Sequence, residues 1–279
     1  MKEYKPQYTI TRIYDDAYAI TDNGLGQGSV YMYLIVGAEK ALLVDSGYGL
    51  LDLNAVIKTV TDKPVICVCT HGHLDHAPGA SQFEEAYIHS KDFDVYKQHT
   101  GSALIMEVGT RGLLMKPPVW MRNNPSYNKL VETMAQKQYP QLKAIDGIKS
   151  FDLGNRTIAW RHVPGHTQGS ISVIDEKYNT AYDADACAPG AWLFLPESSN
   201  LREYKNELEH YQAFLEENNI KRRYVGHTGK ALDAKYLRKL INCVQVSIEK
   251  PKKGIKVKTI LGKARIIFAG GSLLFCSCD

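Results

Sequence analysis

The most constraining feature of this 279-residue chain is the motif THGHLDH at residues 70–76, which directly follows a β-branched run. Alternate residues of an extended segment project to the same side, so His71 and His73 can reach one ion. A turn of the backbone at Asp75 and His76 aims these two side chains at a second ion beside the first. Imidazole and carboxylate groups suit Zn²⁺, with Fe and Mn as alternatives. The motif therefore predicts a metal site at the end of a buried strand.

Further metal-ligand candidates stand at the ends of other strand-like runs. His166 follows a strand in VPGHT, and His227 follows another in YVGH. Asp45 ends the apolar run LLVD, and Asp183 and Asp185 are two carboxylates at the end of one further strand. Each of these is weak evidence alone, because an isolated His after Gly is more often a turn or surface residue. Their order along the chain, taken together with the first motif, is what carries information.

In this order the motifs resemble those of the metallo-β-lactamase superfamily. The matching parts are Asp45, the HGHLDH motif, His166 within PGHT, Asp185, and His227 within GHT. The resemblance implies an α/β (α+β) fold, the αββα sandwich of two mixed β-sheets with helices on the outside. It also implies a dinuclear metal site at the edge between the sheets, holding two divalent ions, with Zn²⁺ expected.

The resemblance further implies a ligand set for the two ions. The ligands are His71, His73 and His166 for the first ion, Asp75, His76 and His227 for the second, and Asp185 as the bridge. Asp185 is preferred over Asp183 because Ala184-Asp185 takes the place of the family's usual Gly-Asp pair. Asp45 is implied as a residue that fixes the orientation of a ligand without binding metal. The other histidines match no part of the pattern and are interpreted as structural or solvated: His89, His99, His162 and His210.

The ligand set predicts hydrolysis. Two neighbouring ions share a water and lower its pKa toward neutrality, which gives a metal-bridging hydroxide as nucleophile. Asp75 is the candidate for orienting this nucleophile and relaying its proton. Familiar β-lactamases carry Cys where this chain has Asp185, and Cys187 lies two residues too late to replace it. We therefore expect an enzyme that hydrolyses a small-molecule ester, thioester or lactone.

Three alternatives remain open from the sequence. A persulfide dioxygenase-like oxidoreductase resembles this fold but binds one iron, so metal stoichiometry separates it from a hydrolase. A phosphodiesterase of the same fold would hydrolyse phosphodiesters, so a hydrolysis assay with these substrates separates it from an esterase. A metal-binding scaffold without catalysis would be favoured by a missing ligand, and every ligand position of the pattern is filled.

Composition sets the class of protein and its partners. The chain is 44% hydrophobic and 23% charged, with a net charge of +4, too small an excess to predict a nucleic-acid partner. Its apolar runs are shorter than the roughly 20 residues that span a bilayer, and its amino terminus lacks an export signal. We therefore expect a cytoplasmic protein with a small-molecule substrate, no membrane partner and six cysteine thiols. A homodimer is left open.

Strand-like runs in two successive halves, each followed by helices, predict a single domain over residues 1–279. A helical or irregular insertion is expected at about residues 89–141, as a lid over the metals or a dimer contact. Its apolar residues, Trp120 among them, would form a pocket wall, with Arg111 or Arg122 offered to an acyl or anionic group. The last part of the chain predicts a helix over residues 231–248. A closing hairpin, with strands at 255–260 and 265–275, is expected after it.

Overall fold

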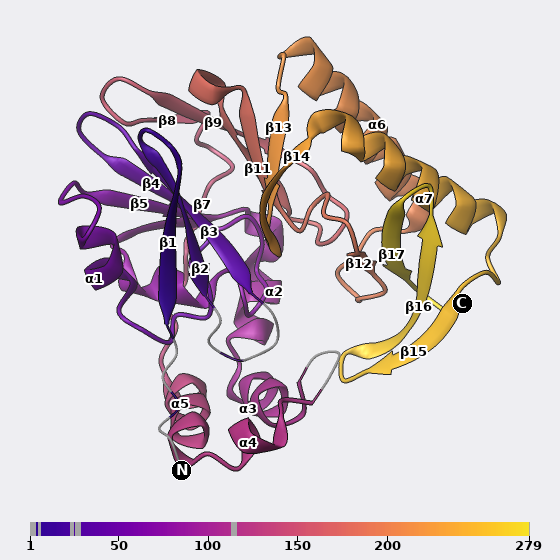
Figure 1. Ribbon diagram of the computed structural model, residues 1–279, viewed down its shortest axis with the longest axis horizontal. Coiled ribbons are helices and arrows are strands. Elements are labelled where there is room, and N and C mark those ends of the chain that lie inside the picture. Colours follow the sequence, from indigo (N-terminus) through magenta and orange to yellow (C-terminus); the bar gives the residue numbers. More distant parts are fainter. Residues whose placement is uncertain (1–3, 5–6, 23–24, 26–28, 113–115, 279) are drawn as a thin grey trace.

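Two mixed β-sheets face each other in the computed structural model, which describes residues 4, 7–22, 25, 29–112 and 116–278. Helices cover the outer faces of the sheets (Figure 1). Between the sheets the ring of Tyr33 lies 5.0 Å from that of Tyr182 and 5.2 Å from that of Tyr224. All three side chains belong to one buried apolar cluster that spans both sheets. The αββα sandwich predicted from the sequence is confirmed.

The first sheet has seven strands, in the order β1-β2-β3-β4-β5-β6-β7. They are β1 (Tyr8–Tyr14), β2 (Ala17–Asp22), β3 (Val30–Val36), β4 (Ala41–Val44), β5 (Val65–Val68), β6 (Glu85–Ile88) and β7 (Lys143–Ala144). Strands β1 to β4 are antiparallel, whereas β4 to β7 run parallel. Val44 pairs with Val68, so Asp45 and the 70–76 motif leave the sheet side by side at the carboxyl ends of neighbouring strands.

The second sheet has six strands, in the order β14-β13-β11-β10-β9-β8. They are β8 (Ser150–Asp152), β9 (Thr157–His162), β10 (Ile171–Asp175), β11 (Thr180–Ala184), β13 (Arg222–Val225) and β14 (Thr228–Asp233). Strands β11 and β13 are parallel, and Ala184 pairs with Val225. This register brings Asp185 and His227 to the same edge of the sheet.

A third, four-stranded sheet was not predicted. It has the order β12-β17-β16-β15, with β12 (Ala191–Leu193), β15 (Ile255–Thr259), β16 (Gly262–Ala269) and β17 (Ser272–Cys276). The strand expected at 265–275 is two antiparallel strands, because Gly270 and Gly271 adopt φ values of 59° and 78° and turn the chain back. The last strand pairs in parallel with β12.

Seven α-helices complete the described part of the chain. They are α1 (Leu53–Lys58), α2 (Phe93–His99), α3 (Ser102–Arg111), α4 (Val119–Arg122), α5 (Pro125–Gln136), α6 (Leu201–Glu217) and α7 (Leu237–Glu249). Figure 1 shows α1 beside the first sheet and the pair α6 and α7 outside the second. The helix expected from residue 231 begins later, at Leu237, because β14 occupies 228–233 and pairs with β13.

The segment 89–141 contains the four helices α2 to α5. Its apolar residues Leu113, Leu114 and Met115 lie outside the described residues. All six cysteines are free thiols, as expected. Among the residues described, no helix has both the length and the apolar composition needed to cross a membrane.

Candidate metal centre

Asp45 ties the two neighbouring strand ends of the first sheet together. Its backbone adopts a left-handed conformation with φ 60°, which is strained for a residue other than Gly. Its carboxylate accepts hydrogen bonds from the backbone N of Thr70 at 2.7 Å and from Nδ1 of His76 at 2.8 Å. The Thr70 hydroxyl also donates to it, at 2.9 Å. The structure thus places Asp45 as the residue that orients His76, which is the role implied for it from the sequence.

The first metal group consists of His71, His73 and His166, which the structure brings together in a buried cluster. Their ring centroids are 4.6 to 4.9 Å apart. Nδ1 of His73 lies 3.0 Å from Nε2 of His166. Two of these rings leave β5 in the same motif, and the third comes from the turn after β9, so both sheets contribute to the group.

Each ring of the first metal group has its outer nitrogen against a hydrogen-bond acceptor. The pairs are His71 Nδ1 with Thr70 Oγ1 (3.1 Å), His73 Nε2 with Glu197 Oε1 (2.9 Å), and His166 Nδ1 with the Trp192 carbonyl (3.0 Å). These acceptors hold the imidazole protons on the outer nitrogens. The inner nitrogens therefore face one another as lone pairs, an arrangement that a cation between them satisfies.

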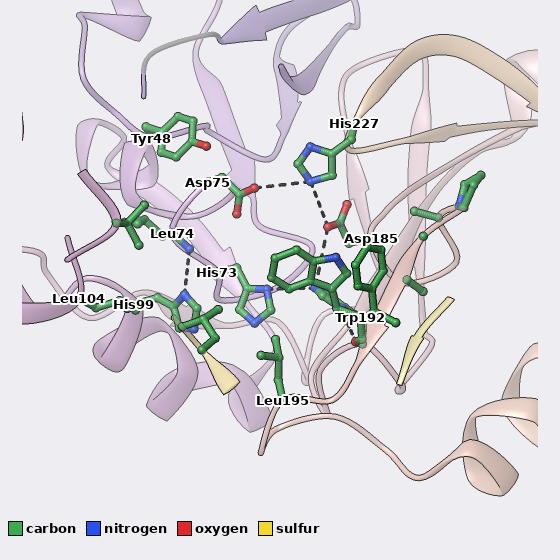
Figure 2. A pocket seen from close by; sticks show the side chains of 18 of the residues that line it. Tyr48, His73, Leu74, Asp75, His99, Leu104, Asp185, Trp192, Leu195 and His227 are labelled. Carbon is green, nitrogen blue, oxygen red and sulfur yellow. Dashed lines mark hydrogen bonds and ion pairs between the residues drawn. The ribbon is translucent and has the colours of Figure 1, made fainter. Parts of the chain in front are cut away.

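The second metal group consists of Asp75, His76 and His227, with Asp185 beside it. Nε2 of His227 lies 3.1 Å from Asp185 Oδ2 and 3.5 Å from Asp75 Oδ2. Nε2 of His76 lies 3.7 Å from an oxygen of each carboxylate. Figure 2 shows Asp75, Asp185 and His227 turned toward one another at one end of the cavity. The outer nitrogen of His227 faces the Ser29 carbonyl at 3.1 Å, so Nε2 is the nitrogen that faces the two carboxylates.

Asp185 lies between the two metal groups. Besides its contacts in the second group, its Oδ2 is 3.9 Å from Nε2 of His166 in the first. Three buried polar atoms around this point have no hydrogen-bond partner in the described structure: His71 Nε2, His76 Nε2 and Asp185 Oδ1. Unpaired buried atoms are costly, and these three are lone-pair donors of the kind that bind divalent ions. The residues therefore fit a metal centre, and all seven predicted ligands converge on it.

Gly226 makes room for this convergence. A Cβ atom added to Gly226 would lie 2.4 Å from Asp185 Oδ1 and 2.6 Å from His76 Cε1. Since atoms of real side chains do not approach so closely, a larger residue before His227 would displace the side chains of Asp185 or His76. This explains the Gly-His pair that the sequence presents after β13.

Asp183, the competing carboxylate, points into the core behind Asp185 and serves a different purpose. It forms a fully buried ion pair with Arg223. Its Oδ1 also accepts hydrogen bonds from Ser172 at 2.6 Å and from Tyr211 at 2.5 Å. Asp183 is therefore a structural residue, and Asp185 alone of the two faces the histidines.

The two metal groups differ in electrostatics. Burial lowers the pKa of His71 well below its usual value and lowers the pKa of His73 to about 3, so both rings are neutral at pH 7. For His76 burial also lowers the pKa, but the carboxylates of Asp75, Asp45 and Asp185 outweigh burial and raise it to about 9. Burial also lowers the pKa of His227, but the carboxylate of Asp185 outweighs burial and raises this pKa to about 10. In the metal-free protein the second group therefore carries protons that the first lacks.

This difference predicts unequal proton release during metal loading. Binding at the second metal group at pH 7 should release about two protons, from His76 and His227, because only neutral imidazole binds metal. Binding at the first should release none from His71 or His73. Because a metal ion must displace protons from the second metal group, the metal affinity of that group should fall as the pH is lowered from 9 to 6. Calorimetry in buffers of different ionisation enthalpy measures this release, and equal release in both steps would contradict the expectation.

A cavity of about 550 Å³ adjoins both metal groups. From the 89–141 segment, Leu104, Val108, Lys116 and Pro118 contribute to its wall, and the four-stranded sheet contributes Trp192, Leu273 and Phe275. Figure 2 shows Tyr48 and Leu104 on one side of the metal residues and Trp192 on the other. The lining is mostly apolar, and its volume is within the range of small-molecule sites.

Some expectations for the 89–141 segment were wrong. Arg111 does not line the cavity but pairs with Glu107 at 2.8 Å on the surface of α3. Arg122 donates to the carbonyl of Pro117 at 2.8 Å and also lies outside the lining. Trp120, expected in the wall, is 61% exposed. The segment's cation in the cavity lining is Lys116.

Two residues near the first metal group were missed from the sequence. His99, interpreted there as structural or solvated, ends α2 and stacks on His73 with ring centroids 4.4 Å apart. Glu197 follows β12 and contacts both rings. A lone His at a helix end and a Glu in a turn carry no local pattern, so their meeting is a consequence of the fold.

The sequence profile described as the Metallo-beta-lactamase superfamily matches residues 25–227, which include every residue of both metal groups. The chain belongs to this superfamily. Known members of the metallo-β-lactamase fold resemble the structure over most of its length. The metallo-β-lactamase from Pontibacter korlensis is 14% identical, with a TM-score of 0.57 over 86% of this chain and 99% of that one. The DIM-1 metallo-β-lactamase is also 14% identical, with a TM-score of 0.59 over 87% and 99%.

Curated relatives of this metallo-β-lactamase-superfamily chain include acyl-coenzyme A thioesterases. The human acyl-coenzyme A thioesterase MBLAC2 is 22% identical over 209 residues, 70% of this chain and 72% of the relative. The protein of the same name from Gallus gallus is 21% identical over 206 residues, 70% of this chain and 71% of the relative. The protein is thus a hydrolase of the metallo-β-lactamase fold with a histidine-rich candidate metal site.

Proposed function

We propose that this protein is a dinuclear metal-dependent hydrolase of acyl thioesters, with carboxylic esters and lactones as related substrates. The observation that supports this proposal most is the apolar cavity that opens directly onto both metal groups. An apolar wall beside a hydrolytic centre suits a substrate with an acyl chain on its carbonyl. The similarity to acyl-coenzyme A thioesterases favours sulfur as the leaving atom.

Asp185 and the two metal groups would hold a pair of divalent ions, with Zn²⁺ as the ion proposed. When bound, such a pair supplies a nucleophilic water at neutral pH and polarises the carbonyl under attack. Burial raises the pKa of Asp75, but His76 and His227 outweigh burial and lower it. Asp75 is therefore a carboxylate at pH 7, able to accept a proton from a water held beside it.

The cavity walls bind and orient the acyl chain. Leu104 and Val108 approach from α3, and Leu273 and Phe275 approach from the four-stranded sheet, so an apolar chain loses water on both sides. Tyr48 lines the cavity on the side of Asp75. Burial raises its pKa well above the usual value, so its phenol stays protonated and available as a hydrogen-bond donor to the substrate.

Chain-length dependence tests the placement of the acyl group. Catalytic efficiency toward straight-chain acyl thioesters of N-acetylcysteamine should rise about fourfold per added methylene until the cavity is filled, because burying one methylene is worth about 0.8 kcal/mol. Leu104→Asp should flatten this dependence without changing metal content. Thr110→Asp, on the exposed side of the same helix, is the matched control. Thiol release measured with a chromogenic disulfide gives the rates, and equal rates for all chain lengths would contradict the proposed pocket.

Three further measurements distinguish the alternatives. Preferential hydrolysis of a phosphodiester would indicate the phosphodiesterase reading. Oxygen consumption with a persulfide, by protein that holds one iron per chain, would indicate the mononuclear oxidoreductase. Removal of metal by a chelator should abolish thioester hydrolysis, and its restoration by Zn²⁺ would support the hydrolase.

A further inference from the structure

The turn after β12 encloses the first metal group from outside. Glu197 Oε1 lies 2.9 Å from Nε2 of His73. The hydroxyl of the next residue, Ser198, donates to the carbonyl of His166 at 2.8 Å. The backbone N of Ser199 donates to the carbonyl of Gly165, also at 2.8 Å. Three consecutive residues thus hold two of the three histidines of this group, although they are distant from both in the sequence.

His99 supports Glu197 from the cavity side. Its Nδ1 accepts a hydrogen bond from the backbone N of Leu74 at 3.3 Å, so a neutral His99 carries its proton on Nε2. That nitrogen lies 3.8 Å from Glu197 Oε1. Glu197 therefore stands between the N–H groups of two imidazoles, with its side chain 13% exposed. A carboxylate this well shielded from water is stabilised by such donors.

The neutral ring of His73 has two tautomers, which differ in which nitrogen bears the proton. If the proton were on Nδ1, it would point at Nε2 of His166 3.0 Å away and fill the space between the ligands. With Glu197 accepting from Nε2, the lone pair of Nδ1 is free. The other two rings of the group are fixed by the neutral acceptors Thr70 Oγ1 and the Trp192 carbonyl, so Glu197 is the acceptor that brings a negative charge to this group.

We propose that Glu197 is the positioning residue of the first metal group: its carboxylate holds the proton of His73 on Nε2, so that Nδ1 presents its lone pair toward His71 and His166. Glu197 also makes the ring a stronger ligand, because a hydrogen-bonded carboxylate raises the basicity of the opposite nitrogen. It thereby sets the affinity of the first metal group and has little effect on the second. The inference rests on the metal centre of the proposed function and is independent of the substrate.

Metal affinity of two matched variants tests this role. Glu197→Leu removes the acceptor and should weaken the first metal group for Co²⁺ and Zn²⁺ by about 10- to 100-fold. Glu197→Gln retains an oxygen acceptor but not the charge, so its loss of affinity should be smaller than that of Glu197→Leu. Affinities are measured on metal-free protein by competition with a chromophoric chelator. Glu207→Leu, a half-buried Glu on α6, is the control and should change neither affinity.

A second replacement assigns each binding step. His227→Ala removes a residue of the second metal group, so the step that survives in this background belongs to the first. The absorption bands of Co²⁺ in that step should shift in Glu197→Leu, which a loss of overall stability alone would not produce. If Glu197→Leu does not fold, as judged by thermal unfolding without metal, Glu197→Asp serves instead. This change withdraws the carboxylate from His73 and should cause the same selective loss.

Unchanged affinity of the first step in both Glu197→Leu and Glu197→Asp would overturn the inference. An equal loss in both binding steps would also overturn it, because a positioning role predicts selectivity. A different result would refute the proposed function. A natural protein that binds two ions but hydrolyses no acyl thioester would refute the substrate while leaving the affinity result intact.

Discussion

Asp185→Asn is expected to reduce thioester hydrolysis on the order of 1,000-fold while the protein remains folded. The side chain lies within 3.9 Å of histidines from both metal groups, so losing its charge removes the link between them. The charge stabilisation supplied by a bound metal is worth several kcal/mol, and about 1.4 kcal/mol corresponds to tenfold in rate. Catalytic efficiency, metal content and thermal unfolding are measured together. Two bound ions with near-normal turnover would show that Asp185 is not the bridge.

Asp183→Ala, unlike Asp185→Asn, is expected to reduce stability rather than activity. The free energy of unfolding should fall by about 3–5 kcal/mol. Asp183 and Arg223 are fully buried, so the change leaves the Arg223 guanidinium without its counter-charge. The Ser172 and Tyr211 hydroxyls also lose their acceptor. Urea unfolding of metal-free protein measures the change in free energy.

Activity per folded molecule separates the two carboxylates. In Asp183→Ala, assayed at a temperature where the variant is folded, hydrolysis should stay within a few-fold of the natural protein. A stability loss below about 1 kcal/mol would mean that the buried ion pair is compensated by its surroundings. Asp183 lies in β11 and Asp185 directly follows that strand, so the pair provides an internal control for a change of charge at nearly the same place in the chain.

The residues of the candidate metal centre were predictable because the motifs that contain them are local. In residues 70–76, four candidate ligands follow one strand, and a change from extended to turned backbone is enough to direct them into the two metal groups. His166, Asp185 and His227 each end a strand, and parallel or neighbouring strands bring their ends to one edge. The chemistry of the residue types then identifies the kind of site.

The surroundings of those ligands were not predictable in the same way. Glu197 and His99 are 98 residues apart and meet only because the turn after β12 reaches the end of α2. Strand β12 is too short to give a periodic pattern, and its partner β17 lies at the other end of the second half. The predicted helix wrongly included residues 231–233, which end β14, because the pairing of β14 with β13 depends on a tight turn at Gly226 and His227. Contacts that depend on distant segments leave little trace in local composition.

The backbone and the side chain of Trp192 have different roles. The carbonyl fixes His166, whereas the indole contributes to the cavity wall together with Leu273 and Phe275 of the four-stranded sheet. The residues of both metal groups come from loops of the two larger sheets. Mutations that alter the side chains of the four-stranded sheet can therefore change which molecules fit the cavity while the backbone contact to His166 persists. Substrate range and hydrolytic chemistry are in this way free to evolve at different rates within one compact chain.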